Sequence, residues 1–311
     1  MKKAFITGVN GFVGGVLAKH LSGEFQVIGT DLEPHCKSPD VDHYFPADIR
    51  DGQKLEQIFT EHSFDHVYHL AAISSLPKAN SSPHLTMEIN LLGTISLLDA
   101  AAATKSSSRI LIVGSSKEYS PGLPGPIDEQ AQMIPTSFYG ISKLACELCA
   151  RQYIGRGLDI LFSRSFNHTG PGQAPSFVLS DWTRQAALIR HNKQEPVLET
   201  GSLEESIDFT DVRDVVRAYQ LILDKGKTGE AYNVCSGEGV RLSDVLDMIV
   251  SKTEMPVSIK SSQAKLSRTS VPQPAGNNGK LISHTGWSRS FTLDQTIEDL
   301  YHYWLTEINN Q

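Results

Sequence analysis

The sequence predicts an α/β protein, a doubly wound parallel sheet of the Rossmann type with a smaller C-terminal lobe that binds the substrate. In the first half, short apolar runs alternate with helical patterns, which is typical of parallel strands covered by helices on both faces. A glycine-rich turn separates the first strand from the first helix. After residue 166 the pattern becomes mixed, and turn-forming residues are frequent. The length of 311 residues suits one large domain or two closely joined ones.

The predicted elements follow one another in regular order. Strands are expected at 3–8, 25–31, 43–48, 65–72, 109–116 and 158–166, and helices at 11–21, 51–62, 90–103 and 138–153. In the second of these helices, Leu55, Ile58 and Phe59 share one face. Later, a strand at 230–236 is expected to return to the sheet, and 241–252 is expected to be an amphipathic helix. We therefore divide the chain into a dinucleotide-binding domain, 1–166 with part of 209–240, and a lobe formed mainly by 167–311.

Composition excludes some classes of function. The formal net charge is −7 and lysines and arginines form no run, so broad nucleic-acid binding is not expected. We find no secretory signal and no stretch of about 18 apolar residues that could span a bilayer, so we expect a soluble, cytoplasmic protein without a membrane partner. The four cysteines form no metal-binding pattern with histidines, and we expect no metal site.

Residues 8–14 predict the site of a dinucleotide. Gly8, Gly11 and Gly14 stand between a strand and a helix, where glycines allow a tight turn and a close approach to a pyrophosphate. The helix N-terminus adds backbone amides for the phosphates. Asp31 ends the second strand, where a carboxylate accepts ribose hydroxyls and repels a 2′-phosphate. We expect NAD(H) to be preferred, with NADP(H) as the alternative, and three more residues of the turn to bind it: Asn10, Phe12 and Val13.

Tyr139 and Lys143 lie one turn apart on a predicted helix, and Ser115 ends the strand before it. A tyrosine is a weak acid near neutrality, and an ammonium one turn away is expected to lower the tyrosine pKa. Tyr139 would then donate a proton to a carbonyl oxygen that Ser115 binds, while Lys143 reaches the nicotinamide ribose. The order of the glycine turn, the serine and the tyrosine–lysine pair predicts a nicotinamide-dependent oxidoreductase.

Over its whole length, the chain resembles the extended short-chain dehydrogenases/reductases. The similarity lies in TGVNGFVGG at 7–15, HLAA at 69–72, Asn90, GSS at 114–116 and YGISK at 139–143. In the second half, FNHTGPGQ at 166–173, FTDVRDVVRAY at 209–219 and YNVCSGEG at 232–239 resemble bacterial GDP-4-keto-6-deoxy-mannose reductases. The resemblance implies a homodimer, with Asn167 near the sugar diphosphate and Ser75 near the sugar ring. It also implies further cofactor contacts from Asp48, Ile49, Leu70, Ala71, Ala72, Asn90 and Phe166.

Two positions depart from the pattern of these relatives. Sugar-nucleotide 4,6-dehydratases carry a glutamate two residues before the tyrosine that is Tyr119 here, and this chain has Lys117, with Glu118 beside it. An ammonium is a poor substitute in the elimination of water, which favours a simple ketoreductase. Relatives usually carry a phosphate-binding arginine where this chain has Ile207. Either Arg184 or Arg268 then binds the phosphates, or the nucleotide differs.

The leading hypothesis is the NAD(P)H-dependent reduction of a nucleotide-linked 4-keto-6-deoxy sugar to the 4-hydroxy sugar, for the biosynthesis of a surface polysaccharide such as lipopolysaccharide O-antigen. An NAD-retaining 4-epimerase would use the same three residues. A 4,6-dehydratase and a non-catalytic NAD-binding protein are further alternatives. His168 lies beside the predicted site, where a hydrogen bond that stabilises its loop is favoured over substrate contact.

Overall fold

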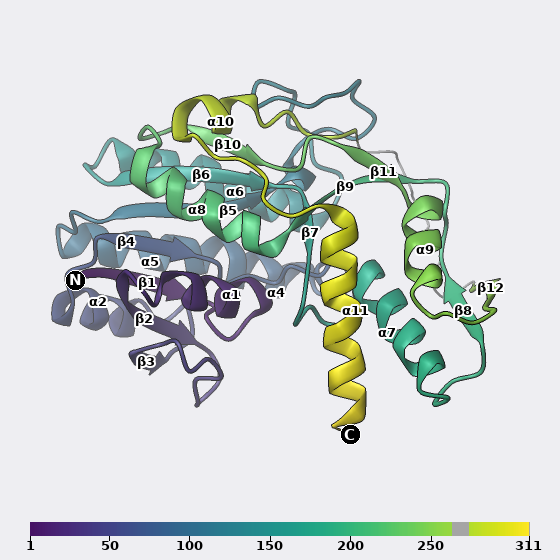
Figure 1. Ribbon diagram of the computed structural model, residues 1–311. Coiled ribbons are helices and arrows are strands. Elements are labelled where there is room, and N and C mark those ends of the chain that lie inside the picture. Colours follow the sequence, from purple (N-terminus) through teal and green to yellow (C-terminus); the bar gives the residue numbers. More distant parts are fainter. Residues whose placement is uncertain (263–273, 311) are drawn as a thin grey trace.

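The computed structural model describes residues 1–262 and 274–310 and contains a seven-stranded parallel sheet (Figure 1). The strand order is β10-β6-β5-β4-β1-β2-β3. The strands are β1 Lys2–Thr7, β2 Phe25–Asp31, β3 His43–Pro46, β4 His66–His69, β5 Arg109–Ser115, β6 Asp159–Ser165 and β10 Ala231–Val234. The chain reverses its direction of winding between β1 and β4, which creates a crevice at the carboxyl ends of these strands. The predicted fold class is confirmed.

Helices cover both faces of this sheet. Helices α1 (Phe12–Leu21), α8 (Val212–Lys225) and α10 (Gly279–Thr285) pack on one face, and α2 (Gly52–Glu61), α5 (Gly93–Ala103) and α6 (Phe138–Ile154) on the other. The side chains of β1 alternate between the two cores, with Ala4 and Ile6 in the first and Phe5 in the second. The central strands are therefore buried on both sides, as the continuous apolar runs predict, whereas the edge strand β3 has no fully buried residue.

A third core lies to one side of the sheet (Figure 1). It joins α7 (Val178–Arg190), α9 (Leu242–Ser251) and α11 (Leu293–Asn309), with Trp182, Leu246 and Ile297 fully or almost fully buried. Two small sheets adjoin it, one of β11 (Gly239–Arg241), β9 (Ser206–Asp211) and β7 (Asn167–Thr169), the other of β12 (Ser258–Ser261) and β8 (Val197–Thr200). The amphipathic helix predicted at 241–252 corresponds to α9, whereas the mixed pattern of this half does not predict α11, which has 17 residues, as many as α6.

The helix before β5 is longer than predicted. It follows α3 (Leu76–Ser81), begins with α4 (Pro83–Met87), widens into a π-turn at Glu88–Leu92 and continues as α5. By length and composition, the 21 residues Pro83–Ala103 could cross a membrane, which corrects our expectation that no such stretch exists. In the fold, α5 packs between α2 and α6 against the sheet, as a core helix does.

Candidate active site

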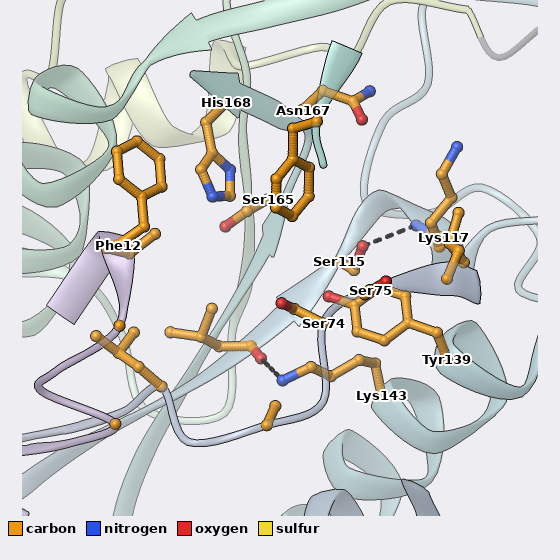
Figure 2. Close-up of a pocket in the computed structure, with 18 of the residues that line it drawn as sticks. Phe12, Ser74, Ser75, Ser115, Lys117, Tyr139, Lys143, Ser165, Asn167 and His168 are labelled. Carbon is orange, nitrogen blue, oxygen red and sulfur yellow. Dashed lines mark hydrogen bonds between the residues drawn. The ribbon is translucent and has the colours of Figure 1, made fainter. Parts of the chain in front are cut away.

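A cavity of about 620 Å³ opens at the carboxyl ends of β1, β4, β5 and β6. It extends from the glycine turn, past the ends of the central strands, to the loop before α7. Most of the predicted site residues line this cavity: Gly8, Gly11, Phe12, Val13, Gly14, Asp31, Leu70, Ala72, Ser75, Ser115, Tyr139, Lys143, Phe166 and Asn167. Figure 2 shows Phe12 on one side of this cavity and Ser115, Tyr139 and Lys143 on the other.

The glycine turn has the shape that a dinucleotide requires. Gly8 has a φ of +73°, and a Cβ atom there would lie 2.9 Å from the backbone nitrogen of Ala71. A Cβ atom on Gly14 would clash with the carbonyl oxygen of Gly8, so α1 can approach β1 this closely only with glycine at that position. Gly11 is the N-cap of α1 and has no side chain that could accept a hydrogen bond from the first turn of the helix. The backbone N–H groups of that turn can therefore bind the phosphates. The residues present therefore fit the pyrophosphate of a dinucleotide cofactor.

Asp31 lines the same end of the cavity at the tip of β2. Its carboxylate accepts the backbone N–H groups of Asn10 (3.0 Å) and Leu32 (2.8 Å), and these two bonds fix the side chain beside the glycine turn. The backbone of Asn10 thus contributes to this end of the site. The Asn10 side chain donates to the carbonyl oxygen of His35 (2.9 Å) instead of lining the cavity.

Ser115 and Tyr139 lie next to each other in the cavity wall (Figure 2), and the Ser115 side chain acts to lower the Tyr139 pKa. Ser115 ends β5 and caps the short 3-10 turn Ser116–Glu118, where its hydroxyl accepts the N–H of Lys117 (3.2 Å). Tyr139 stands in the first turn of α6, which Ser137 caps by accepting the N–H of Gly140 (3.1 Å). Two capped turns thus hold the serine and the phenol side by side.

Lys143 does not act on Tyr139 as the sequence predicted. Its Nζ donates to the carbonyl oxygen of Val113 (2.8 Å), and burial lowers the pKa of this ammonium (Figure 2). Burial raises the pKa of Tyr139 above its ordinary value, and the Ser115 side chain only partly opposes this rise. The expected lowering of the phenol pKa by Lys143 is therefore wrong for this structure.

Several predicted cofactor contacts lie outside the cavity. Asp48 is bound by Arg50, with Nη2 and Oδ2 2.6 Å apart, and this guanidinium lowers the Asp48 pKa. Ile49 is buried against Gly93, and the N–H of Ala71 donates to the hydroxyl of Thr7 (3.2 Å). None of the three lines the cavity. They support the cofactor loop or the adjacent helices.

Asn90 also supports the site from outside the cavity. It stands in the π-turn, where its amide accepts the N–H of Ile73 (2.8 Å) and donates to the hydroxyl of Ser142 (2.9 Å). The side chain therefore ties the loop after β4 to α6, close to Tyr139. π-turns are frequently found at functional sites.

Of the two arginines proposed for the phosphates, Arg184 does not line the cavity. The Arg184 guanidinium lies over the ring of Trp304, with its Cζ 5.9 Å from the ring centroid. Arg268 lies outside the residues that the structure describes. A second, much smaller cavity of about 50 Å³ is lined by both positions that depart from the family pattern, Lys117 and Ile207, together with Asn167, Glu205 and Asp208.

Lys117, which replaces the glutamate of the dehydratases, lines the main cavity, and so do further residues that the sequence did not assign to the site: Ser74, Leu76, Pro77, Val113, Gly114, Ser116, Ser165, Gln173, Ala174, Ser176, Phe177 and Tyr219. His168, which we assigned to loop stabilisation, donates from Nδ1 to the carbonyl oxygen of Phe166 (3.0 Å) and also lines the cavity. Burial lowers its pKa and so favours the neutral ring. Since Ser165, Phe166 and Asn167 follow one another at the end of β6, the position of that strand end was the available signal.

Among residues 1–262 and 274–310, no group of three or more histidine, cysteine, aspartate or glutamate side chains is arranged to hold a metal ion. The four cysteines lie in the described part of the chain as free thiols. Ser115, Tyr139 and Lys143 bring a hydroxyl, a phenol and an ammonium to the cavity beside the glycine turn.

Comparisons with known proteins agree with this geometry. A family model described as GDP-mannose 4,6 dehydratase matches residues 5–300. The chain is 33% identical to the GDP-6-deoxy-D-mannose reductase of Pseudomonas aeruginosa, over 100% of this chain and 99% of that protein. Among solved structures, RMD from Pseudomonas aeruginosa complexed with NADPH has a TM-score of 0.88 at 32% identity, covering 99% of this chain and 100% of that one. UDP-glucose 4-epimerase from Thermotoga maritima has the same fold, with a TM-score of 0.88 at 23% identity over 98% and 99% of the two chains.

Proposed function

Since the chain belongs to the GDP-mannose 4,6 dehydratase family of extended short-chain dehydrogenases/reductases, we propose that it reduces a GDP-linked 4-keto-6-deoxy sugar to the 4-hydroxy sugar. The observation that carries this function is the set Ser115, Tyr139 and Lys143 in one cavity with the glycine turn. The full-length similarity to a GDP-6-deoxy-D-mannose reductase supports the choice of sugar and nucleotide. Surface polysaccharide biosynthesis in the cytoplasm is the setting that such a product indicates.

The chain's own residues supply orientation and a proton. A bound, reduced nicotinamide supplies the hydride. Ser115 holds the ketone oxygen by a hydrogen bond, and Tyr139 passes its hydroxyl proton to that oxygen as the carbon is reduced. Lys143 lines the same cavity and donates from Nζ to the carbonyl oxygen of Val113, and we assign its ammonium to the nicotinamide ribose. Because burial raises the Tyr139 pKa, the proton stays on the phenol near neutral pH, which suits a proton donor.

Lys117 distinguishes reduction from dehydration. Elimination of water across C5 and C6 requires a carboxylate beside the sugar, and this position of the cavity wall holds an ammonium. Burial lowers the pKa of Lys117, and the charge of Glu205 only partly opposes this lowering. A cation at this place cannot take a proton from C5. Reduction without dehydration is therefore the reaction that the wall supports.

The test is an assay with GDP-4-keto-6-deoxy-mannose and either NADH or NADPH. We expect the reduced cofactor to be consumed and a GDP-6-deoxyhexose to form. The variant Tyr139→Phe removes the proton donor, so turnover should fall by about 10²-fold or more while cofactor binding stays within about twofold. Ser120→Ala, a hydroxyl outside the cavity, is the control and should keep full activity. If Y139F consumed the reduced cofactor at the wild-type rate, Tyr139 would not be the proton donor.

A 4-epimerase remains the competing outcome, because the same three residues would serve it. The purified protein would then carry tightly held NAD and need no added cofactor. A UDP- or GDP-hexose would be converted to its 4-epimer without net change in the nicotinamide. Consumption of one reduced cofactor per product decides for the reductase.

We further propose that NAD(H) is preferred, that residues 167–311 form most of the substrate lobe, and that the protein is a homodimer. Asp31 at the glycine turn supports the first proposal, and the separate core of α7, α9 and α11 supports the second.

The proposal of a dimer is supported by exposed apolar side chains on α6, where Ile141 is 39% and Leu148 is 51% exposed. The two lie seven residues apart and therefore on one face.

A further inference from the structure

Glu118 is a buried carboxyl group that contacts the backbone of Ser115 and acts electrostatically on Tyr139. It ends the 3-10 turn after β5 and is 0% exposed. Its Oε1 accepts the backbone N–H of Ser115 at 2.6 Å, while the Ser115 hydroxyl caps the same turn. A Cβ atom on Gly114 would clash with this Oε1, so the carboxyl lies against the end of the strand. The residue therefore fixes the backbone of the serine that lies beside Tyr139 in the cavity wall.

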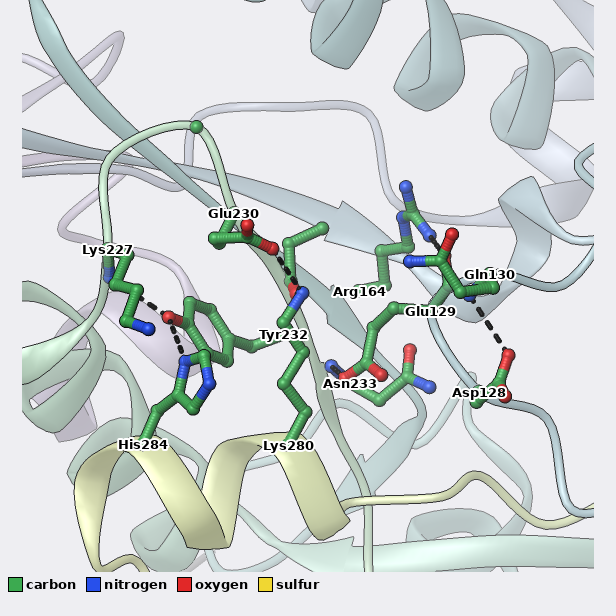
Figure 3. Close-up of polar contacts among 12 residues, drawn as sticks. Asp128, Glu129, Gln130, Arg164, Lys227, Glu230, Tyr232, Asn233, Lys280 and His284 are labelled. Carbon is green, nitrogen blue, oxygen red and sulfur yellow. Dashed lines mark hydrogen bonds and ion pairs between the residues drawn. The ribbon is translucent and has the colours of Figure 1, made fainter.

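The second oxygen of Glu118 is much less satisfied. Oε2 is buried and has no hydrogen-bond partner among the described residues, and the Arg164 Nε lies 3.9 Å away. That guanidinium is already engaged, since it donates to both carboxylate oxygens of Glu147 (3.0 and 2.8 Å) and to the carbonyl oxygen of Glu129 (2.9 Å). Figure 3 shows Arg164 beside Glu129 in this polar cluster. Glu118 thus shares one cation with a better-placed carboxylate.

The charged and titratable groups that act on or accompany Glu118 come from three elements. They are Tyr139, Lys143, Cys146 and Glu147 on α6, Arg164 on β6, and Tyr119 beside it in the chain. Burial and the charge of Glu147 raise the pKa of Glu118 to about 8, so the neutral form is favoured near neutral pH. The ionised form raises the Tyr139 pKa and therefore opposes loss of the phenol proton.

We propose that Glu118 is a positioning residue that holds Ser115 against Tyr139 and, through its charge, controls how readily Tyr139 releases its proton. The role rests on the proposed function in one respect, because it takes Tyr139 as the proton donor. While Glu118 is neutral, proton transfer to the ketone is unhindered. When Glu118 becomes an anion, the phenolate that transfer leaves behind is disfavoured, and reduction slows.

Two variants separate position from charge. Glu118→Gln keeps an oxygen that accepts the Ser115 N–H and removes the charge, whereas Glu118→Ala removes both. For the wild type, we expect kcat/KM to fall about three- to tenfold between pH 7 and pH 9. E118Q should lose less than about twofold over the same range, and E118A should show a kcat lowered about tenfold or more at every pH with an unchanged KM for the cofactor.

Glu129→Gln is the matched control. Glu129 also accepts a backbone N–H, that of Asn233 (2.8 Å), and lies beside Arg164 (Figure 3), but it is not among the groups with the largest effect on the Tyr139 pKa. E129Q should keep the wild-type pH profile. If kcat/KM of E118Q falls between pH 7 and pH 9 as much as that of the wild type, the role of charge is overturned. If E118A has full activity, the role of position is overturned. If E118A does not fold, as judged by thermal unfolding, the kcat of E118Q at pH 7 decides for position: a value within twofold of the wild type supports it, and a larger loss overturns it.

An infrared titration tests Glu118 without any turnover. A protonated carboxyl band should disappear near pH 8 in the wild type and in E129Q and be absent from E118Q. Loss of this band at pH 4–5 in the wild type would overturn the proposal even in an active enzyme. If no keto sugar is reduced, the proposed function fails while the band still reports on Glu118.

Discussion

At the scale of single residues, the sequence indicated which side chains line the site but not their pKa values. The glycines at 8 and 14 are required by one positive φ and one close contact, both properties of local backbone that a strand–turn–helix pattern specifies. The pKa of Tyr139 depends on what surrounds it in three dimensions. The sequence spacing to Lys143 suggested a lowered pKa, but burial outweighs that neighbour. Glu118, adjacent in sequence to a discussed position, gave no sign of being fully buried.

Asp31 allows a residue-scale prediction about the cofactor. Its carboxylate is fixed by Asn10 and Leu32 at the end of the cavity where the ribose of the adenosine half would lie. Asp31→Asn keeps an acceptor and removes the charge that repels a 2′-phosphate. The ratio of kcat/KM for NADPH to that for NADH should rise about tenfold, which is about 1.4 kcal/mol.

The control for this change is Glu33→Gln, two residues farther along. Glu33 is an exposed carboxylate that pairs with Lys37 (2.7 Å) and does not line the cavity. Steady-state kinetics with both cofactors should give the wild-type ratio for E33Q. An unchanged ratio in D31N would show that the carboxylate does not select the cofactor.

At the scale of elements, the sequence predicted the six strands and four helices of the first half because their apolar residues repeat with a clear period. In the second half, α8 carried a signal that we did not use: Asp211 caps it and Val215, Tyr219 and Ile222 are buried at helical spacing. Strands β7 and β11, each of three residues, carry no such signal. They exist because β9 lies between them and supplies their hydrogen bonds.

The exposed apolar face of α6 carries the element-scale prediction. If a second copy covers Ile141 and Leu148, a charge there must be buried without a partner on association. Leu148→Glu should therefore convert a dimer into monomers in sedimentation velocity at micromolar concentration. Ile282→Glu, at a 45% exposed position on α10, is the control and should remain dimeric. A monomeric wild type would contradict the proposed dimer directly.

At the scale of the whole molecule, the position of the site followed from the fold class. In a doubly wound sheet, ligands bind at the carboxyl ends of the strands near the reversal of strand order, and the cavity lies at the ends of β1, β4, β5 and β6. The sequence did not predict which residues of the second half line the cavity. Ser176 and Phe177 reach the cavity from the loop before α7 because a separate core places that loop there. The position of Arg184 over Trp304 follows from the same packing.

A buried polar chain beneath the cofactor turn links the stability of the whole fold to pH. The Thr7 hydroxyl lies 2.8 Å from His69 Nδ1, and His69 Nε2 lies 2.9 Å from the Thr94 hydroxyl. Since Thr7 accepts the N–H groups of Leu70 and Ala71, its own proton goes to Nδ1, and the ring is neutral with its proton on Nε2. Burial, aided by Lys143, lowers the His69 pKa to about 3.

The sign of the pH effect follows from this lowered pKa. Below about pH 6.5 the unfolded chain binds a proton at His69 that the folded protein does not bind until about pH 3. The free energy of unfolding therefore decreases on acidification across that range, by up to about 1.4 kcal/mol per pH unit from this residue.

The variant His69→Gln should be less stable than the wild type at pH 7, because it loses the geometry of both hydrogen bonds. Its free energy of unfolding should nevertheless decrease less than that of the wild type between pH 6.5 and pH 5. His84→Gln, at an exposed surface position, should keep the wild-type slope. Urea unfolding at a series of pH values measures these slopes, and equal slopes for H69Q and the wild type would show that His69 is protonated in the folded protein.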